Sequence, residues 1–214
     1  CVGNHKDREL ESWHQLNTPY PEDLRAGHVA PEDVDYVMCT HLHGDHVGWN
    51  TRLDDGRWVP TFPNAKYLFS KGDWAQYENI RPGDHGYASW TDSVLPIMEA
   101  GLAELVETDF ALDDTVYLSP SPGHTPGHYC VNLNSGGRKA VLSGDLIHHP
   151  VQCVRPDWSS NFCADPDASR VTRHAFVDTY AETDVTILAA HFAGPTAGHI
   201  VRGEGDGCVF RALT

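Results

Sequence analysis

The chain has 214 residues, 40% of them hydrophobic and 21% charged, which is the composition of a folded globular protein and not of a disordered or fibrous one. Thirty acidic and 15 basic side chains give a formal net charge of −15, which repels polyanions, so we expect no nucleic-acid partner. We find neither an apolar run long enough to cross a bilayer nor a basic-then-apolar leader, so we expect no membrane contact and a cytoplasmic protein.

The cysteines and histidines are distributed very differently. The six cysteines are scattered without a C-x-x-C pair, so we expect reduced packing residues and no disulfide framework. They are Cys1, Cys39, Cys130, Cys153, Cys163 and Cys208. The 14 histidines are numerous for a chain of this length and are concentrated in a few short stretches.

The first part of the chain predicts short elements separated by loops. Residues 8–28 are typical of a short helix and loop interrupted by Pro19 and Pro21. Residues 30–40 then predict a turn followed by a short, buried apolar strand, which ends at a cluster of histidines.

The next stretch predicts a strand, a helix, a loop and a longer helix. The strand covers 65–69 and the helix covers 71–78, and a loop rich in glycine, proline and histidine follows over 80–92. Apolar residues at helical spacing predict a helix over 93–107, with Ser93 as its N-cap.

The second half of the chain is dominated by strand patterns. Strands are predicted over 115–120, 128–134, 139–145 and 185–191, with a hairpin turn over 135–138. A helix is predicted over 166–182. A closing hairpin is predicted with strands over 199–203 and 208–213 and a turn over 204–207. Since no linker, repeat or low-complexity segment interrupts the chain, we expect one domain, 1–214, of layered α and β structure.

The stretch "CTHLHGDHVGWN", residues 39–50, carries the strongest chemical signal. On an extended segment, His41 and His43 project to the same side. Asp45 and His46 follow Gly44, at which the chain can turn sharply. Imidazole and carboxylate ligands without thiolate suit zinc, manganese, iron, cobalt or nickel, and four of them can converge on one ion or straddle two.

Three further candidate ligands lie at strand-to-loop junctions later in the chain. His124 lies in "SPGHTPGHY", Asp145 in "VLSGDLIHHP" and His191 in "ILAAHFAGP". Such junctions are the places where α/β sheets usually display functional side chains.

Taken together and in order, "THLHGDH", "PGHTPGH", "SGD" and "AAH" resemble the metallo-β-lactamase fold hydrolases, whose signature is H-x-H-x-D-H. The similarity covers nearly the whole chain from about residue 30. It implies an α/β (α+β) fold, the four-layered αββα metallo-β-lactamase sandwich. Because few residues precede His41, we expect the first N-terminal strands of that sandwich to be lacking.

The resemblance also implies a dinuclear metal site and a hydrolytic reaction. One metal would be held by His41, His43 and His124, the second by Asp45, His46 and His191, and Asp145 would bridge the two. We expect two divalent ions, zinc first, with manganese, iron, cobalt or nickel as alternatives. A hydroxide bridging the two metals would then cleave a small ester, lactone or phosphotriester, the work of an esterase or lactonase.

Asp45, in addition to its role as a ligand, and His148 are the residues expected to take part in catalysis. His148 lies three residues beyond Asp145, where it could contact substrate or transfer a proton, or serve structure alone. The string "GDLIH" is similar to phosphotriester-cleaving relatives of methyl-parathion hydrolases, whereas acyl-homoserine lactonases commonly carry a tyrosine in this region.

Aromatic residues near these motifs admit two interpretations each. Trp49 could form a wall of the pocket or pack in the core, and packing is slightly favoured. Trp158 and Phe162 lie in a loop that could line a pocket for an apolar group or anchor a surface loop. The remaining histidines have separate expectations. His128 is expected to support the ligands from behind or to be structural, and His199 to be structural. His174 could be packed or exposed, and His149 is less suited than His148 to contact substrate. Surface positions are expected for His5, His14, His28 and His85.

Several alternatives remain open at this level. Within the same fold, the chain could be a β-lactamase or a glyoxalase-II-like thioesterase. A di-iron redox protein and a non-catalytic binding module are candidates of other classes. We expect a small-molecule substrate, and a homodimer is left open.

Overall fold

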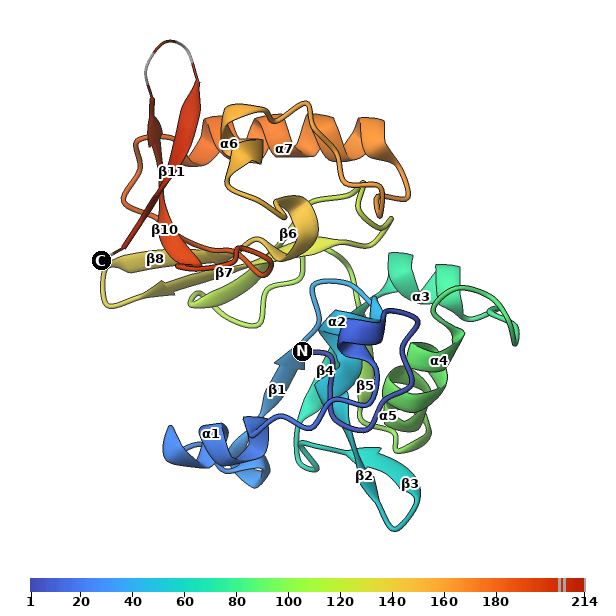
Figure 1. The fold of residues 1–214 in the computed structure, drawn as a ribbon. Coiled ribbons are helices and arrows are strands. Elements are labelled where there is room, and N and C mark those ends of the chain that lie inside the picture. The colour runs from blue at the N-terminus through green and yellow to red at the C-terminus, as the bar shows by residue number, and fades with distance from the viewer. Residues whose placement is uncertain (204, 206, 214) are drawn as a thin grey trace. The chain divides into compact units, whose positions relative to one another are not determined.

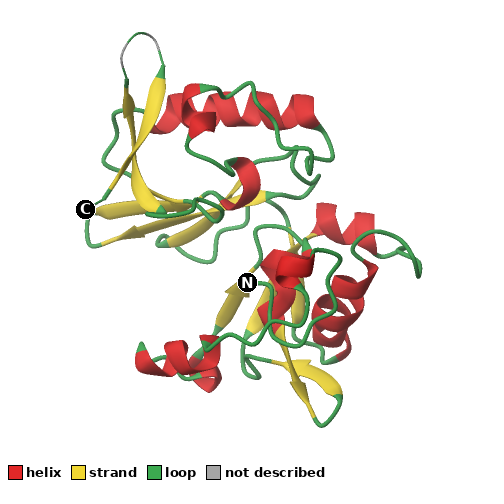
Figure 2. Ribbon diagram, viewed as in Figure 1, coloured by secondary structure: helices red, strands yellow, loops and turns green. Residues whose placement is uncertain are grey.

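The computed structural model describes all residues except 204, 206 and 214, and the chain falls into two compact units, Cys1–Val106 and Glu107–Thr214. Each unit has its own sheet and its own helices (Figure 1; Figure 2). The expectation of one domain over 1–214 stays a prediction. Within the described residues, no helix is long and apolar enough to span a membrane.

The first unit is built on a three-stranded parallel sheet in the order β1-β4-β5. Its strands are β1 (Tyr36–Met38), β4 (Lys66–Ser70) and β5 (Ala103–Val106). The central strand β4 has the sequence "KYLFS" and is buried at its last four positions, as expected when neighbours pair on both sides and both faces are covered.

Short helices and a separate hairpin complete the first unit. The helices are η1 (Glu11–Trp13), α1 (Tyr20–Ala26), η2 (Pro31–Asp33), α2 (Gly44–Val47), η3 (Gly48–Asn50), α3 (Lys71–Tyr77), α4 (Tyr87–Ser89), η4 (Trp90–Val94, a π-helical turn) and α5 (Leu95–Glu99), and the hairpin pairs β2 (Thr51–Asp54) with β3 (Arg57–Pro60). The core beside the sheet includes Phe69, Tyr67, Val47 and Ile97, each essentially inaccessible to solvent.

The N-terminal segment is held against the rest of the first unit by two basic side chains. Lys6 is fully buried, donates a hydrogen bond to the Asp92 carbonyl (2.9 Å) and lies over the Trp58 ring. Arg8 donates to both carboxylate oxygens of Asp92, at 2.7 and 3.1 Å. A fork-shaped contact of this kind fixes orientation as well as distance, and it therefore fixes the position of Arg8.

The second unit contains a six-stranded sheet in the order β11-β10-β9-β8-β7-β6, antiparallel except for the parallel pair β8–β9. The strands are β6 (Val116–Pro120), β7 (Tyr129–Ser135), β8 (Arg138–Leu142), β9 (Thr186–Leu188), β10 (Ala197–Arg202) and β11 (Cys208–Ala212). The predicted hairpin turn between β7 and β8 is confirmed. Its two central residues, Gly136 and Gly137, both have positive φ (58° and 74°), which a two-residue turn of this type requires.

One long helix supplies much of the core of the second unit. The helices are η5 (Gly144–Leu146), α6 (Val151–Val154) and α7 (Pro166–Tyr180). Phe176 and Val177 of α7 pack in one buried cluster with Val141, Ile187 and Ile200 from three strands. The side chain of Asp165 caps α7 by accepting hydrogen bonds from the first helical N–H groups.

The predicted helix over 93–107 is wrong in its second half. Helix α5 ends at Glu99, Gly101 follows with φ +70°, and the chain then enters strand β5. A glycine in this conformation is a common helix terminator, and the short apolar run beyond it pairs with β4. Ser93 is not an N-cap either, because it lies inside the π-helical turn.

Four smaller points of the sequence analysis also need correction. Helix α4 begins at Tyr87, inside the segment predicted as a loop over 80–92, and the hairpin β2–β3 was not predicted at all. Pro21 lies in the first turn of α1 and does not interrupt it, since the first helical N–H groups have no partner within the helix. Strand β1 is only half-buried, not buried. The middle of the closing turn over 204–207 lies partly outside the described residues.

Candidate metal centre

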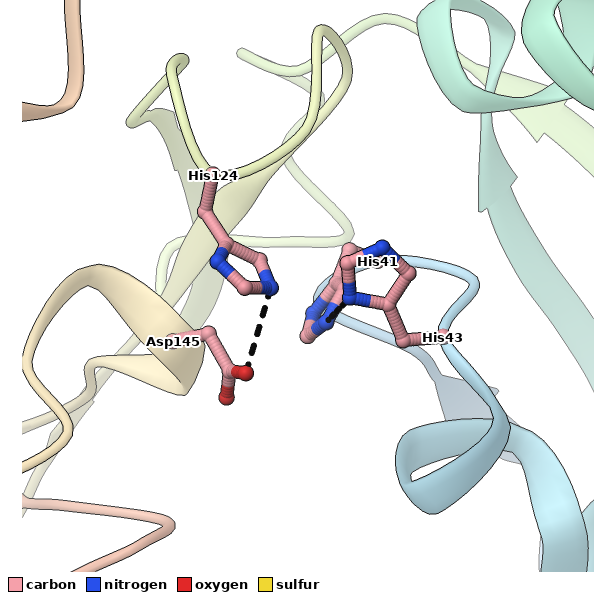
Figure 3. A group of neighbouring side chains, drawn as sticks. All are labelled: His41, His43, His124 and Asp145. Carbon is pink, nitrogen blue, oxygen red and sulfur yellow. Dashed lines mark hydrogen bonds and ion pairs between the residues drawn. The ribbon is translucent and has the colours of Figure 1, made fainter. Parts of the chain in front are cut away.

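The first unit contributes a pair of imidazoles directly after β1. His41 Nε2 and His43 Nδ1 lie 3.1 Å apart, as drawn in Figure 3, and the rings meet edge to face. The residue between them, Leu42, points into the core, and its backbone N–H donates to Asp73 (3.1 Å). Strand-like alternation therefore places the two histidines on one side, as predicted.

Asp45 and His46 follow on the short helix α2. Asp45 Oδ2 lies 3.3 Å from His46 Nε2, and the His46 ring lies against the His41 ring with centroids 4.1 Å apart. The turn between the two pairs is a helix start, so Gly44 is not required for a left-handed conformation. Space favours glycine there, because a Cβ would lie 3.2 Å from Arg8 Nε and from Ser89 Cβ, closer than an ordinary van der Waals contact.

The second unit contributes Asp145, a carboxylate with its two oxygens directed to different histidines. Oδ2 lies 3.2 Å from His124 Nε2, the contact drawn in Figure 3, and Oδ1 lies 3.1 Å from His191 Nε2. Asp145 is 3% exposed and lies on η5, which directly follows β8. This arrangement is what a carboxylate that bridges two ions requires.

The backbone around Asp145 is fixed by a histidine that the sequence placed outside the ligand set. The Asp145 N–H donates to His128 Nε2 (3.0 Å), and His128 Nδ1 pairs with Ser121 Oγ (2.7 Å). His128 is fully buried. It therefore supports the turn that carries the carboxylate.

His148 faces the same carboxylate. Its Nε2 lies 3.2 Å from Asp145 Oδ2, and its ring stacks on His191 with an interplanar angle of 12°. The His148 N–H is held by Gln152 Oε1 (2.7 Å), and Gln152 also donates to the Trp158 carbonyl. The side chain is thus placed beside the candidate ligands by its own backbone contacts.

The His124 imidazole lies where positive charge is stabilised. Burial lowers its pKa, but hydrogen bonds with Asp145 and Cys163 outweigh burial and raise the pKa to about 9. The carboxylate beside Nε2 therefore favours a cation at that position, whether a proton or a metal ion.

The residues in each unit have the spacing that divalent metal ions require. Two ligands of a tetrahedral ion bound at about 2.0–2.1 Å lie about 3.3 Å apart. The four contacts described above, two in each unit, span 3.1 to 3.3 Å between ligand atoms. The donors are imidazole nitrogens and carboxylate oxygens, so the residues fit zinc or a similar ion.

The aromatic residues near the sequence motifs differ in burial. Trp49 is buried and stacks on Tyr20, which supports the packing interpretation. It also lines a cavity of about 340 Å³ beside the first three residues. Trp158 and Phe162 are 57% and 67% exposed, so neither anchors its loop in the core.

Other predictions concern residues away from this chemistry. Four buried cysteines, Cys39, Cys130, Cys153 and Cys208, are reduced packing residues as expected. The predicted surface histidines His5, His14, His28 and His85 are exposed. His199 Nδ1 donates a hydrogen bond to the Val185 carbonyl (3.0 Å), which agrees with a structural role. Cys163 beside His124 was missed, because no sequence spacing connects two residues 39 positions apart.

Comparisons with known proteins define the class. The family model described as the metallo-beta-lactamase superfamily matches residues 2–191, and the chain belongs to this superfamily. The predicted resemblance and the metallo-β-lactamase fold are thereby confirmed.

The individual relatives share only about a quarter to a third of their aligned residues with this chain. An N-acyl homoserine lactonase from a Bacillus species is 31% identical over 112 residues, which cover 52% of this chain and 38% of that protein. The chain thus matches well under half the length of this relative. Among solved structures, the hydrolase AbOPH has a TM-score of 0.81 at 24% identity, covering 95% of this chain and 72% of the other. AidC, a dizinc quorum-quenching lactonase, has a TM-score of 0.76 at 22% identity, covering 90% and 69%.

Proposed function

We propose that this protein is a metal-dependent hydrolase that opens a small lactone ring by attack of water on the ester carbonyl. The observation that carries the proposal is the Asp145 carboxylate, which offers Oδ2 on the side of His124 and Oδ1 on the side of His191. A carboxylate with this geometry serves two ions at once, as in two-metal hydrolytic sites.

The proposed ligand set combines the two groups of side chains, one from each unit. His41, His43 and His124 would hold one divalent ion, Asp45, His46 and His191 would hold the other, and Asp145 would bridge them. Family membership supports this combination, and so does the ligand spacing within each unit. Zinc is proposed because the donors are imidazole and carboxylate, and one structural relative is described as dizinc.

Each part of the site has a defined task in this proposal. Divalent ions supply Lewis-acid chemistry there, since they make water a better nucleophile at neutral pH and polarise a carbonyl. The carboxylates of Asp45 and Asp145 offset two of the positive charges, and the remaining charge favours an oxygen that becomes negative in the transition state. Asp45 is proposed to hold the attacking water by accepting a hydrogen bond. His148, whose Nε2 lies 3.2 Å from Asp145 Oδ2, is proposed to hold or donate a proton.

A panel of substrates tests the proposed function. Zinc-loaded protein is expected to hydrolyse an N-acyl homoserine lactone with a higher kcat/KM than an aryl ester, an aryl phosphotriester, a cephalosporin or a thioester. The lactone is placed first because several curated relatives are named N-acyl homoserine lactonases. Preference for another member of the panel would overturn the substrate, and failure on every member would overturn the hydrolase itself.

His148 gives a second prediction about the same reaction. In His148→Phe, the planar ring that stacks on His191 is kept and the Nε2 atom near Asp145 is lost. We expect kcat to fall by roughly 10²-fold with bound zinc unchanged, the size typical of a lost acid or base.

The neighbouring histidine is the matched control for this variant. His149 is exposed, and its ring accepts a hydrogen bond from Val151 (3.1 Å), so His149→Phe should leave kcat within about twofold. Equal kcat values in the two variants, measured at saturating substrate and with zinc counted, would assign His148 to structure alone.

A further inference from the structure

The two nitrogens of the His124 ring face different partners. Nε2 lies 3.2 Å from Asp145 Oδ2, and Nδ1 lies 3.8 Å from the sulfur of Cys163. The nitrogens of an imidazole point away from each other, so a ligand bound at Nε2 cannot also be bound by this sulfur. Cys163 is therefore on the far side of the ring from the proposed metal.

An imidazole can bind metal through Nε2 only if its other nitrogen keeps the proton. That proton needs an acceptor, and the acceptor decides which tautomer forms and how the ring is turned. Acceptors of this kind are commonly carboxylates or backbone carbonyls, whereas in this chain the group beside Nδ1 is a thiol.

The backbone holds Cys163 beside His124. The Ala164 N–H donates to the His124 carbonyl (2.9 Å), and the Asp165 N–H donates to the Gly123 carbonyl (2.9 Å). The loop can approach so closely because residue 123 is glycine, with φ +125° and a hypothetical Cβ only 2.1 Å from Ser169 N. These contacts fix the position of the sulfur independently of its side-chain contacts.

The thiol hydrogen has a separate partner, which leaves the sulfur lone pairs for His124. Cys163 donates to Ser169 Oγ (3.4 Å), and the same oxygen accepts a hydrogen bond from Arg173 Nη1 (3.1 Å). A thiol that donates in one direction can accept in another, so an N–H from Nδ1 completes the arrangement.

Arg173 connects this network to the turn that carries Asp145. Its guanidinium is fully buried, and it donates to the carbonyls of Leu146 (3.2 Å) and Pro156 (3.0 Å) as well as to Ser159 Oγ (2.8 Å). Leu146 directly follows Asp145. One rigid donor group thus fixes both the carboxylate turn and the serine that holds Cys163.

From these contacts we propose that Cys163 is a positioning residue: its sulfur accepts the Nδ1–H of His124 and so turns Nε2 toward the metal, with Ser169 and Arg173 holding the thiol in place. The proposal rests on the proposed function in that His124 is taken as a metal ligand. It adds a residue, outside the ligand set, that sets the strength of metal binding.

The test compares variants of Cys163 with a cysteine that is buried elsewhere. In Cys163→Ala the acceptor is lost, and in Cys163→Ser an oxygen acceptor is kept. Cys153→Ala removes the same atoms from the hydrophobic cluster of the second unit and is the control for lost packing. Zinc affinity is measured by competition with a chromophoric chelator, and unfolding by urea titration.

We expect Cys163→Ala to bind zinc 10- to 100-fold more weakly, the usual cost of losing a partner behind a ligand, and Cys163→Ser to recover most of the loss. The Nδ1 proton of His124, followed by NMR in the zinc-loaded protein, should exchange with solvent faster in Cys163→Ala and not in Cys153→Ala. The proposal would be overturned if Cys163→Ala had the same Nδ1 proton exchange rate as the wild type and bound zinc as tightly as Cys153→Ala.

Two further outcomes of these experiments have a defined interpretation. If Cys163→Ala does not fold, Cys163→Val, which fills the same space without an acceptor, takes its place with the same expected results. If the wild-type protein binds zinc but hydrolyses no member of the substrate panel, the proposed function fails, while the zinc affinities and the proton exchange rate still decide the role of Cys163.

Discussion

Asp145→Ala is expected to lose lactone hydrolysis almost completely, by roughly 10³-fold or more, because a site deprived of its metals loses several kcal/mol of transition-state stabilisation. Asp145 is 3% exposed, and its carboxylate oxygens lie within 3.2 Å of His124, His148 and His191. Its removal leaves these imidazoles without the negative charge that would favour a cation between them. The measurement is kcat/KM for the lactone, with zinc content determined on the same sample.

Two controls show whether the effect arises from the bridging carboxylate. Asp178→Ala removes an exposed carboxylate from α7 and should leave zinc content and kcat/KM unchanged. Asp145→Asn keeps the size of the side chain and loses its charge, so it should resemble the alanine variant. If Asp145→Asn contained as much zinc as the wild type, the proposal that the negative charge of Asp145 holds the metals would be contradicted.

Removal of metal from the wild-type protein is the second large effect. Chelation is expected to abolish hydrolysis, and added zinc should restore it, since the side chains alone offer no covalent nucleophile in this proposal. Metal that binds only the folded state stabilises it by about 4 kcal/mol at a thousandfold excess over Kd. For a chain of this length, we therefore expect Tm to fall by roughly 8–16 °C on chelation.

The two predictions check each other. Chelator should leave the Tm of Asp145→Ala nearly unchanged, because that variant has no bound metal to lose. A wild-type protein that keeps full activity after its zinc has been shown to be absent would refute the metal-dependent mechanism. A large Tm shift of the variant on chelation would instead place the stabilising metal elsewhere in the chain.

Local patterns in the sequence were sufficient to predict the structure wherever the residues that determine it lie within one short segment. The spacing of His41 and His43 already placed both imidazoles on one side, because side chains alternate along an extended backbone. The paired glycines 136 and 137 already predicted a hairpin, because glycine adopts left-handed positions without strain and a two-residue turn needs two in succession. Helix α7 was also predicted nearly to its ends, because the pattern that indicates it lies within one continuous segment.

Patterns failed where a partner distant in the sequence decides the structure. The apolar residues of 103–106 are compatible with a helix or a strand, and parallel pairing with β4 selects the strand. The short helix α4 and the hairpin β2–β3 were missed within segments that contain many turn-forming residues. A short apolar or polar run has no preference strong enough to resist its tertiary surroundings.

For the site, the sequence by itself determined which residues could be ligands, because imidazole and carboxylate groups at this spacing are the donors that divalent metal ions bind. Only the tertiary structure directed the two oxygens of Asp145 to different histidines, placed His148 against the same carboxylate, and brought the sulfur of Cys163 to the far nitrogen of His124. The physical reason is that ligand identity is a property of single side chains. Ligand orientation, in contrast, depends on hydrogen bonds between segments that meet only after the chain has folded.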